Sequence, residues 1–153
     1  MDIKDLMPRD GADTLRIGND DNLVVMENFG HLPKGNLRLN NHGIIVICTA
    51  GMAQFDYDGQ QIQLRKNDLF LYMAHSVACN FMSSPDFNCR QIWFSRSELW
   101  NIDMYGEIGL ADLTYLKQHA KVPLTENDIT LLDDYFRLLC RRLLLQQLQT
   151  ERC

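Results

Sequence analysis

The sequence predicts a mainly β protein, a small antiparallel β-barrel followed by short helices and one long helix with two apolar faces. Between about residues 22 and 95, short apolar runs alternate with turn residues, and an Asp-Gly pair separates two of these runs. After residue 95 the apolar periodicity becomes helical. A chain of 153 residues is long enough for one domain with a sizeable core.

Eight strands are expected in a barrel over residues 21–96, after an acidic N-terminal arm over residues 1–20. They cover residues 23–27, 37–39, 43–49, 53–57, 60–64, 69–72, 76–81 and 89–94. The turn at Asp58-Gly59 is the clearest local signal, because this dipeptide favours the positive φ angles of a two-residue hairpin. Eight short strands at this spacing favour a small barrel over an open sheet.

The segment 97–153 is expected to be helical. Ser97 can cap a short helix that ends near residue 102, and residues 110–118 form a second candidate. The longest periodic run extends from Glu126 to about Gln149. Thr125 lies just before this run and Asp128 lies in its first turn, three positions later, which is the spacing of a capping box.

The long helix carries two apolar stripes. The broad stripe contains Ile129, Leu132, Phe136, Leu139, Cys140, Leu143 and Leu144. The narrow stripe, at spacing seven on roughly the opposite side, contains Leu131, Leu138 and Leu145. A helix that lies on one core needs one apolar face, so the narrow stripe predicts a homodimer. Coverage by another helix of the same chain, such as 110–118, is the alternative.

Composition excludes several partners. The net charge is −5 and no segment forms a basic stripe, so we expect contact with DNA only through a domain outside this chain. No apolar run reaches the roughly 18 residues that span a bilayer, and the polar N-terminus is not a signal peptide. Five cysteines without a C-x-x-C pair indicate reduced thiols, so we expect a cytoplasmic protein that does not bind membranes.

The residues that could carry catalysis are scattered. His31, His42, His75 and His119 lie far apart, and residues 43–51 lack the His-x-His and Glu of a metal-dependent barrel enzyme. No cysteine or serine has an activated context. We therefore expect no enzymatic activity, no metal and no cofactor. The alternatives are a metal-dependent isomerase or oxygenase with an atypical site, and a ligand-free dimerisation module whose barrel is solid core.

The strand at residues 89–94 predicts a wall for a small-molecule pocket. Alternation places Cys89, Gln91 and Trp93 on one face of this strand. If that face points inward, Trp93 supplies a flat apolar surface and Gln91 an amide that donates and accepts hydrogen bonds. Pockets for small polar molecules combine such groups. The alternative is that Trp93 is ordinary core.

Four sequence strings, in this order and spacing, resemble the N-terminal domain of AraC-type transcription regulators, of the kind found in Bacteroides-like genomes. They are Cys48-Thr49-Ala50-Gly51, Phe55-Asp56-Tyr57-Asp58-Gly59, Lys66-Asn67-Asp68-Leu69-Phe70-Leu71 and Ile92-Trp93-Phe94-Ser95-Arg96-Ser97. The resemblance covers about residues 20–149. It implies a cupin-like barrel that binds a small-molecule effector, with a sugar as one candidate, and a helix-turn-helix DNA-binding domain absent from this chain.

The resemblance also implies which residues contact the effector. By position these are Asn36 or Arg38, Asn80, Cys89, Gln91 and Trp93. The chain departs from the family pattern at Asn67, where the family has a glycine, and at Met73-Ala74, where it has prolines. In the implied mechanism, the bound effector changes how the arm or the terminal helices pack, and so how two DNA-binding domains are presented.

Overall fold

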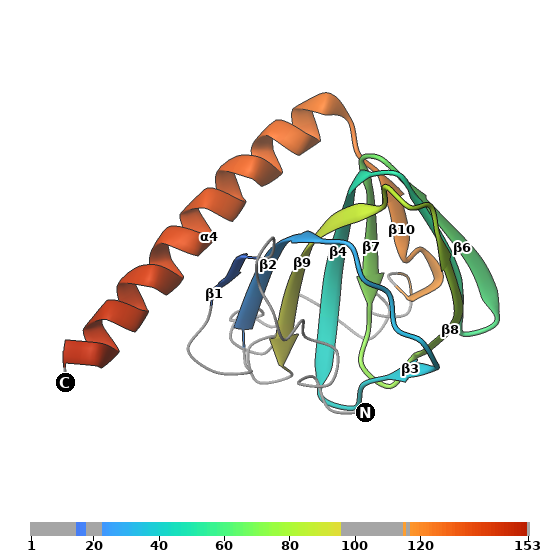
Figure 1. The fold of residues 1–153 in the computed structure, drawn as a ribbon, viewed down its shortest axis with the longest axis horizontal. Coiled ribbons are helices and arrows are strands. Elements are labelled where there is room, and N and C mark those ends of the chain that lie inside the picture. Colours follow the sequence, from blue (N-terminus) through green and yellow to red (C-terminus); the bar gives the residue numbers. More distant parts are fainter. Residues whose placement is uncertain (1–14, 18–22, 96–114, 116, 153) are drawn as a thin grey trace.

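The computed structural model describes residues 15–17, 23–95, 115 and 117–152. Within these ranges ten strands form two antiparallel sheets, followed by the helix α4 (Glu126–Arg152). The larger sheet has the strand order β1-β2-β9-β4-β7-β10, and the smaller sheet has the order β3-β8-β5-β6 (Figure 1). The expected fold class, mainly β with a C-terminal helix, is confirmed.

All eight strands expected from the sequence are present, and two short strands were not expected. The strands are β1 (Leu15–Ile17), β2 (Leu23–Phe29), β3 (Leu37–Arg38), β4 (His42–Ala50), β5 (Met52–Tyr57), β6 (Gln60–Arg65), β7 (Asp68–Tyr72), β8 (Val77–Ser83), β9 (Asn88–Ser95) and β10 (Lys121–Pro123). The unexpected strands β1 and β10 pair with β2 and β7. Most of the acidic arm, the short helix expected at 97–102 and most of the helix expected at 110–118 lie outside the described residues.

Residues with positive φ close the turns between strands. Asp58 (φ 47°) and Gly59 (φ 83°) form the expected two-residue hairpin between β5 and β6. Asn67, which stands where the resemblance expects glycine, has a φ of 74°. Asparagine tolerates this left-handed conformation, so the substitution preserves the turn. At Gly51 (φ 68°) a Cβ atom would lie 2.6 Å from Ser84 Oγ and 2.7 Å from the Phe87 backbone, so the turn requires glycine.

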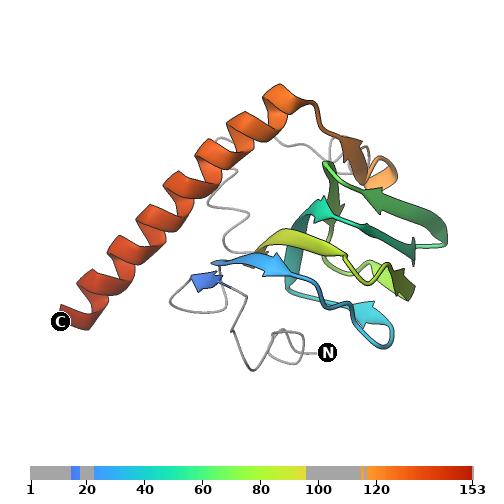
Figure 2. The same cartoon turned by 45° about the horizontal axis from the view of Figure 1, so that its top comes forward.

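The helix α4 covers the outer face of the larger sheet with its broad stripe. Phe136 is 3% exposed and packs with the buried Val25 and Ile47 of β2 and β4. Ile129, Leu132, Leu139 and Cys140 extend the same contact. Figures 1 and 2 show α4 running obliquely past the strands, so that its C-terminal end projects beyond β1. The broad stripe is therefore confirmed from Ile129 to Cys140 as the face that meets the barrel. The side chains of Leu143 and Leu144 lie outside the described part of the structure.

The capping box predicted at the start of α4 is also present. The backbone N–H of Thr125 donates to Asp128 Oδ2 at 2.9 Å, and the N–H of Asp128 donates to Thr125 Oγ1 at 3.2 Å. These reciprocal bonds use two groups that a helix start would otherwise leave unpaired.

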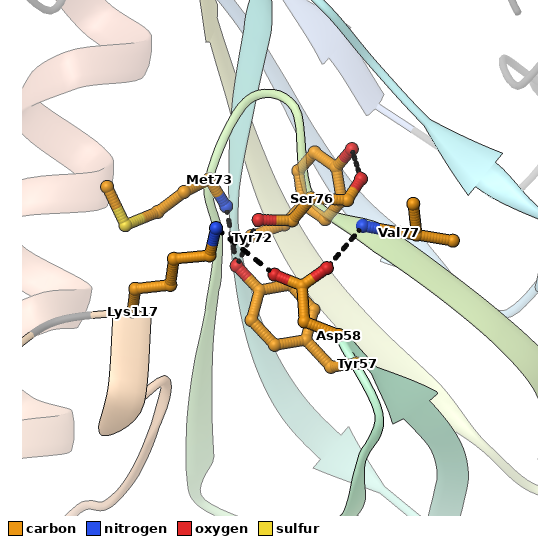
Figure 3. Close-up of polar contacts among 7 residues, drawn as sticks. All are labelled: Tyr57, Asp58, Tyr72, Met73, Ser76, Val77 and Lys117. Atoms are coloured by element: carbon orange, nitrogen blue, oxygen red, sulfur yellow. Dashed lines mark hydrogen bonds and ion pairs between the residues drawn. The ribbon is translucent and has the colours of Figure 1, made fainter. Parts of the chain in front are cut away.

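A buried polar cluster joins the ends of β5, β7 and β8 (Figure 3). Tyr57 Oη donates to Ser76 Oγ at 3.0 Å and accepts from the Met73 N–H at 3.1 Å. Tyr72 Oη donates to the Ser76 carbonyl oxygen at 2.6 Å and accepts from the Leu39 N–H at 2.7 Å. The two phenols thus pair with buried backbone groups that the strand ladders leave free.

Asp58 adds an ionic contact to this cluster. Its Oδ1 accepts from the Val77 N–H at 2.8 Å, and Lys117 Nζ lies 3.4 Å from its Oδ2. Desolvation opposes ionisation of Asp58, but the bonds from Val77, Ser76 and Lys117 outweigh it and hold the pKa of the carboxyl below its ordinary value. Lys117 thereby ties the segment before β10 to the hairpin.

Replacing Tyr72 by Phe should destabilise the fold. The change leaves the Leu39 N–H and the Ser76 carbonyl without their partner in a buried site, at a cost of about 1–3 kcal/mol. Urea unfolding followed by circular dichroism measures the loss. The matched control is Tyr115→Phe, where the side chain is 60% exposed and no change is expected. Equal stability of Tyr72→Phe and wild type would contradict the role given to this phenol.

Candidate functional site

A cavity of about 460 Å³ lies between the two sheets. Its lining is mainly aromatic and aliphatic and comprises Phe29, His31, Leu32, Pro33, Lys34, Gly35, Leu37, Ile44, Val46, Ala53, Phe55, Leu64, Phe70, Tyr72, Ala78, Phe81, Phe87, Cys89, Gln91 and Trp93. The exposed members are His31, Lys34 and Gly35, so the cavity reaches the surface at the connection between β2 and β3. The alternative that the barrel is solid core is not supported.

The aromatic part of the wall was not singled out from the sequence. Phe55 meets Phe70 edge-on, with ring centroids 4.8 Å apart, and lies 5.4 Å from Phe81 in a tilted contact. Phe55 and Phe70 both occupy inward positions of the alternating pattern, on β5 and β7. That alternation is the signal that would have identified them.

A chain of hydrogen bonds runs along the inner face of β9. Trp93 Nε1 donates to Gln91 Oε1 at 2.5 Å, and Gln91 Nε2 donates to Cys89 Sγ at 3.3 Å. The Cys89 thiol in turn donates to the Phe29 carbonyl oxygen at 2.9 Å. All three side chains expected on one face of this strand therefore line the cavity, with their buried polar atoms already paired.

The two cysteines beside this chain are poor nucleophiles. Cys48 and Cys89 stand opposite each other on β4 and β9, and both are buried free thiols. Burial raises the pKa of Cys89 to about 12 and also raises that of Cys48. Thiols of this kind stay protonated at neutral pH and act as small apolar groups.

The remaining residues expected to contact an effector lie outside the cavity wall. Arg38 stands between Leu37 and Leu39, whose buried side chains occupy the inward positions, so Arg38 points to solvent. Asn80 has a φ of 57° at a β-bulge and is exposed, while the next residue, Phe81, lines the cavity.

A second, polar hollow at the cavity mouth contains two of these expected positions. It is lined by Gly30, His31, Leu32, Pro33, Lys34, Gly35, Asn36, Asn80, Phe81 and Ser83. The amide of Asn80 donates to Asp56 Oδ2 at 2.7 Å and is thereby held at the rim. Asn36 and Asn80 thus belong to the surroundings of the opening, whereas Arg38 belongs to neither hollow.

The outer face of β9 anchors α4. Arg90 forms an ion pair with Asp133 of α4, and its Nε lies 3.5 Å from Glu27 Oε1 on β2. The Arg90 guanidinium also lies over the Phe136 ring, 5.3 Å from its centroid. One strand therefore carries the cavity wall on one side and the attachment of the helix on the other.

Metal-ligating side chains do not converge in the described part of the chain. Within it, no group of three or more His, Cys, Asp or Glu side chains is placed to hold a metal ion. Of the described residues, those lining the cavity include His31 and Cys89 but no carboxylate. This set does not fit the sites of two or three histidines with a carboxylate that metal-dependent barrel enzymes use.

Comparison with known proteins finds similarity only among solved structures. No protein-family model matches the chain, and no curated protein does. KdgF from Halomonas sp. has a TM-score of 0.44 at 17% identity, over 54% of this chain and 76% of that one. A cupin protein from Bacteroides fragilis has a TM-score of 0.43 at 14% identity, over 59% and 84%. A predicted oxalate decarboxylase from Thermotoga maritima has 0.38 at 12%, over 58% and 99%.

These comparisons correct one expectation. The sequence-based statement that the chain is not an enzyme is wrong as an exclusion, because a predicted oxalate decarboxylase is among the similar structures. The likenesses are at the level of the fold and assign no reaction to this chain. As for membranes, none of the helices in the described ranges combines the length and the apolar character needed to cross one.

Burial should protect Cys48 and Cys89 from alkylation. At pH 8 a thiol with a pKa of about 12 is ionised in about one molecule in ten thousand, and both Cys48 and Cys89 are buried. Iodoacetamide should therefore label the half-buried Cys79 well before either, as measured by peptide mass spectrometry. The same reaction in guanidinium, where all thiols are accessible, is the control. Fast labelling of Cys89 in the native protein would contradict the closed wall.

Proposed function

We propose that the barrel binds a small, largely apolar effector and that α4 joins two copies of the chain. In this proposal the chain is the regulatory domain of a transcription regulator, and the DNA-binding domain lies outside it. The observation that carries the proposal is the cavity itself, whose β9 wall also holds α4 through Arg90. A ligand that changes the conformation of β9 can therefore change the position of α4 through the contact of Arg90 with the helix.

The polarity of the wall supports an apolar ligand over the sugar considered from the sequence. The polar groups of β9 bond to one another and to the backbone, so few remain for a ligand. A molecule with many hydroxyl groups would leave several of them unpaired in the cavity, and each such loss costs roughly 1–3 kcal/mol. Aromatic and aliphatic groups instead gain contacts with the rings of Phe55, Phe70 and Phe81.

The narrow stripe supports the second half of the proposal. Leu131, Leu138 and Leu145 are 55%, 54% and 53% exposed, and Tyr135 beside them is 60% exposed. Apolar area buried in an interface gains about 25 cal/mol per Å². We propose that this face packs against the same face of a second copy. The face carries both acidic and basic residues, so two copies can pair opposite charges across the interface.

The charge pattern of α4 favours an antiparallel pair. Asp134 lies four residues before Leu138, the centre of the narrow stripe, and Arg142 lies four residues after it. In an antiparallel pair centred on Leu138, residue 131 stands opposite residue 145 of the partner, and residue 134 opposite residue 142. Leucine then meets leucine, and aspartate meets arginine. A parallel pair would bring like charges together instead.

Filling the cavity should abolish ligand binding without unfolding the protein. Val46 lines the cavity and is only partly buried, so Val46→Phe places a ring in the open space. Binding of probes with an apolar chain, such as decanoate and decanamide, is measured by isothermal titration calorimetry. Unfolding by urea checks that the variant is folded. Gln61→Phe, on the exposed end of β6, is the control and should bind as wild type does. Unchanged binding by Val46→Phe would contradict the site.

Sedimentation equilibrium tests the dimer. Leu138→Lys should give a monomer, whereas Met82→Lys, at an equally exposed position on β8, should not. Asp134→Arg and Arg142→Asp should each weaken the dimer about tenfold, because each creates two like-charge contacts. The double variant should regain affinity only if the helices are antiparallel. A monomeric wild type at micromolar concentration would contradict the dimer.

Regulation requires the two sites to be coupled. A ligand shifts the monomer–dimer equilibrium, or the arrangement within the dimer, only through different affinities for the two states. The dimer dissociation constant, or the hydrogen exchange of α4 within the dimer, should therefore change at saturating ligand, and Arg90→Met should reduce that change. A ligand that binds and leaves both quantities unchanged would contradict the regulatory role while leaving the binding site intact.

A further inference from the structure

The opening of the cavity differs in chemistry from its interior. The inner hollow is apolar, and the outer hollow is lined by Asn36, Asn80, Ser83 and the glycines of the β2–β3 connection. The two hollows share residues 31–35 and Phe81, so they form one continuous space. A molecule that fills both would have an apolar body and a polar end.

The described residues that line this opening carry positive charge but no negative charge. Lys34 belongs to both linings, is exposed, and forms no ion pair with any residue that the structure describes. Among the residues that the structure describes, neither lining contains an Asp or Glu side chain. The side-chain amide of Asn80 donates a hydrogen bond to the carboxylate of Asp56, and Asp56 itself lies in neither lining. Although the chain has a net charge of −5, the charged side chain among the described lining residues of the opening is therefore the cation of Lys34.

We propose that the ligand of the barrel is an amphipathic acid, with its apolar body in the inner hollow and its carboxylate beside Lys34. This inference rests on the proposed function, since it names the class of molecule that the same cavity takes. The apolar body supplies most of the affinity by leaving water. The lysine adds selectivity for an anion whose head group keeps part of its hydration at the surface.

The size of the cavity limits the body of this acid. An apolar cavity of about 150 Å³ holds a benzene ring, so a cavity of about 460 Å³ accommodates a chain or ring system of roughly ten to twenty non-hydrogen atoms. Medium-chain fatty acids and arylalkanoic acids fall in this range. Probes of both shapes are therefore suitable.

The test compares each acid with the neutral amide of the same skeleton. Decanoate is paired with decanamide, and 4-phenylbutanoate with 4-phenylbutanamide, by isothermal titration calorimetry at low ionic strength. We expect each acid to bind about five- to tenfold more tightly than its amide. Lys34→Gln should remove this preference by weakening the acid while leaving the amide unchanged. Lys66→Gln, in the exposed turn between β6 and β7, is the matched control and should retain the preference.

The outcomes separate the two proposals. Equal binding of acid and amide to wild type, abolished by Val46→Phe, would overturn the acidic ligand and leave the cavity as the binding site. A preference for the acid that persists in Lys34→Gln would overturn the role of Lys34 and with it this inference. Binding of neither member of either pair would overturn both the ligand class and the proposed binding function.

Discussion

Burial of the larger sheet on both faces is the constraint on which the rest of the structure depends. Its inner face lines the cavity and its outer face carries α4. Because side chains alternate along a strand, each central strand must supply apolar residues at odd positions for one face and at even positions for the other. On β9, Gln91 and Trp93 face inward while Arg90 and Ile92 lie under the helix. A shift of one residue in the pairing of β9 would exchange these sets, so the register is strongly specified.

Much of this architecture could be predicted because it follows from patterns among residues that are close in sequence. Alternation and turn residues identified the eight expected strands, and helical periodicity separated the face of α4 that meets the barrel from the one that is exposed. The strand β10 carries no such pattern, since all three of its residues are exposed. It is held by its pairing with β7 and by the contact of Lys121 with Asp68, 3.7 Å apart, which depend on residues distant in sequence.

The candidate site could be predicted in part. Alternation along one strand placed Cys89, Gln91 and Trp93 on the cavity wall. The family resemblance placed Arg38 at the effector, but its buried neighbours Leu37 and Leu39 take the inward positions and Arg38 points to solvent. Asn80 illustrates another limit, since a bulge interrupts the alternation on β8. Whether a barrel is filled or hollow depends on the summed volume of all inward side chains and the separation of the sheets, so no local pattern reveals it.

The manner in which α4 is attached has a mechanical consequence. The helix is held at Asp133 and Phe136, and its described contact with the barrel extends to Cys140. The residues from Cys140 to Arg152 span about 18 Å. A tilt of about 10° at Cys140 therefore displaces the far end by about 3 Å, although the barrel residues beneath the helix move by only a fraction of that distance. The rigid rod acts as a lever, and the place to look for the largest movement is the end of α4, far from the cavity.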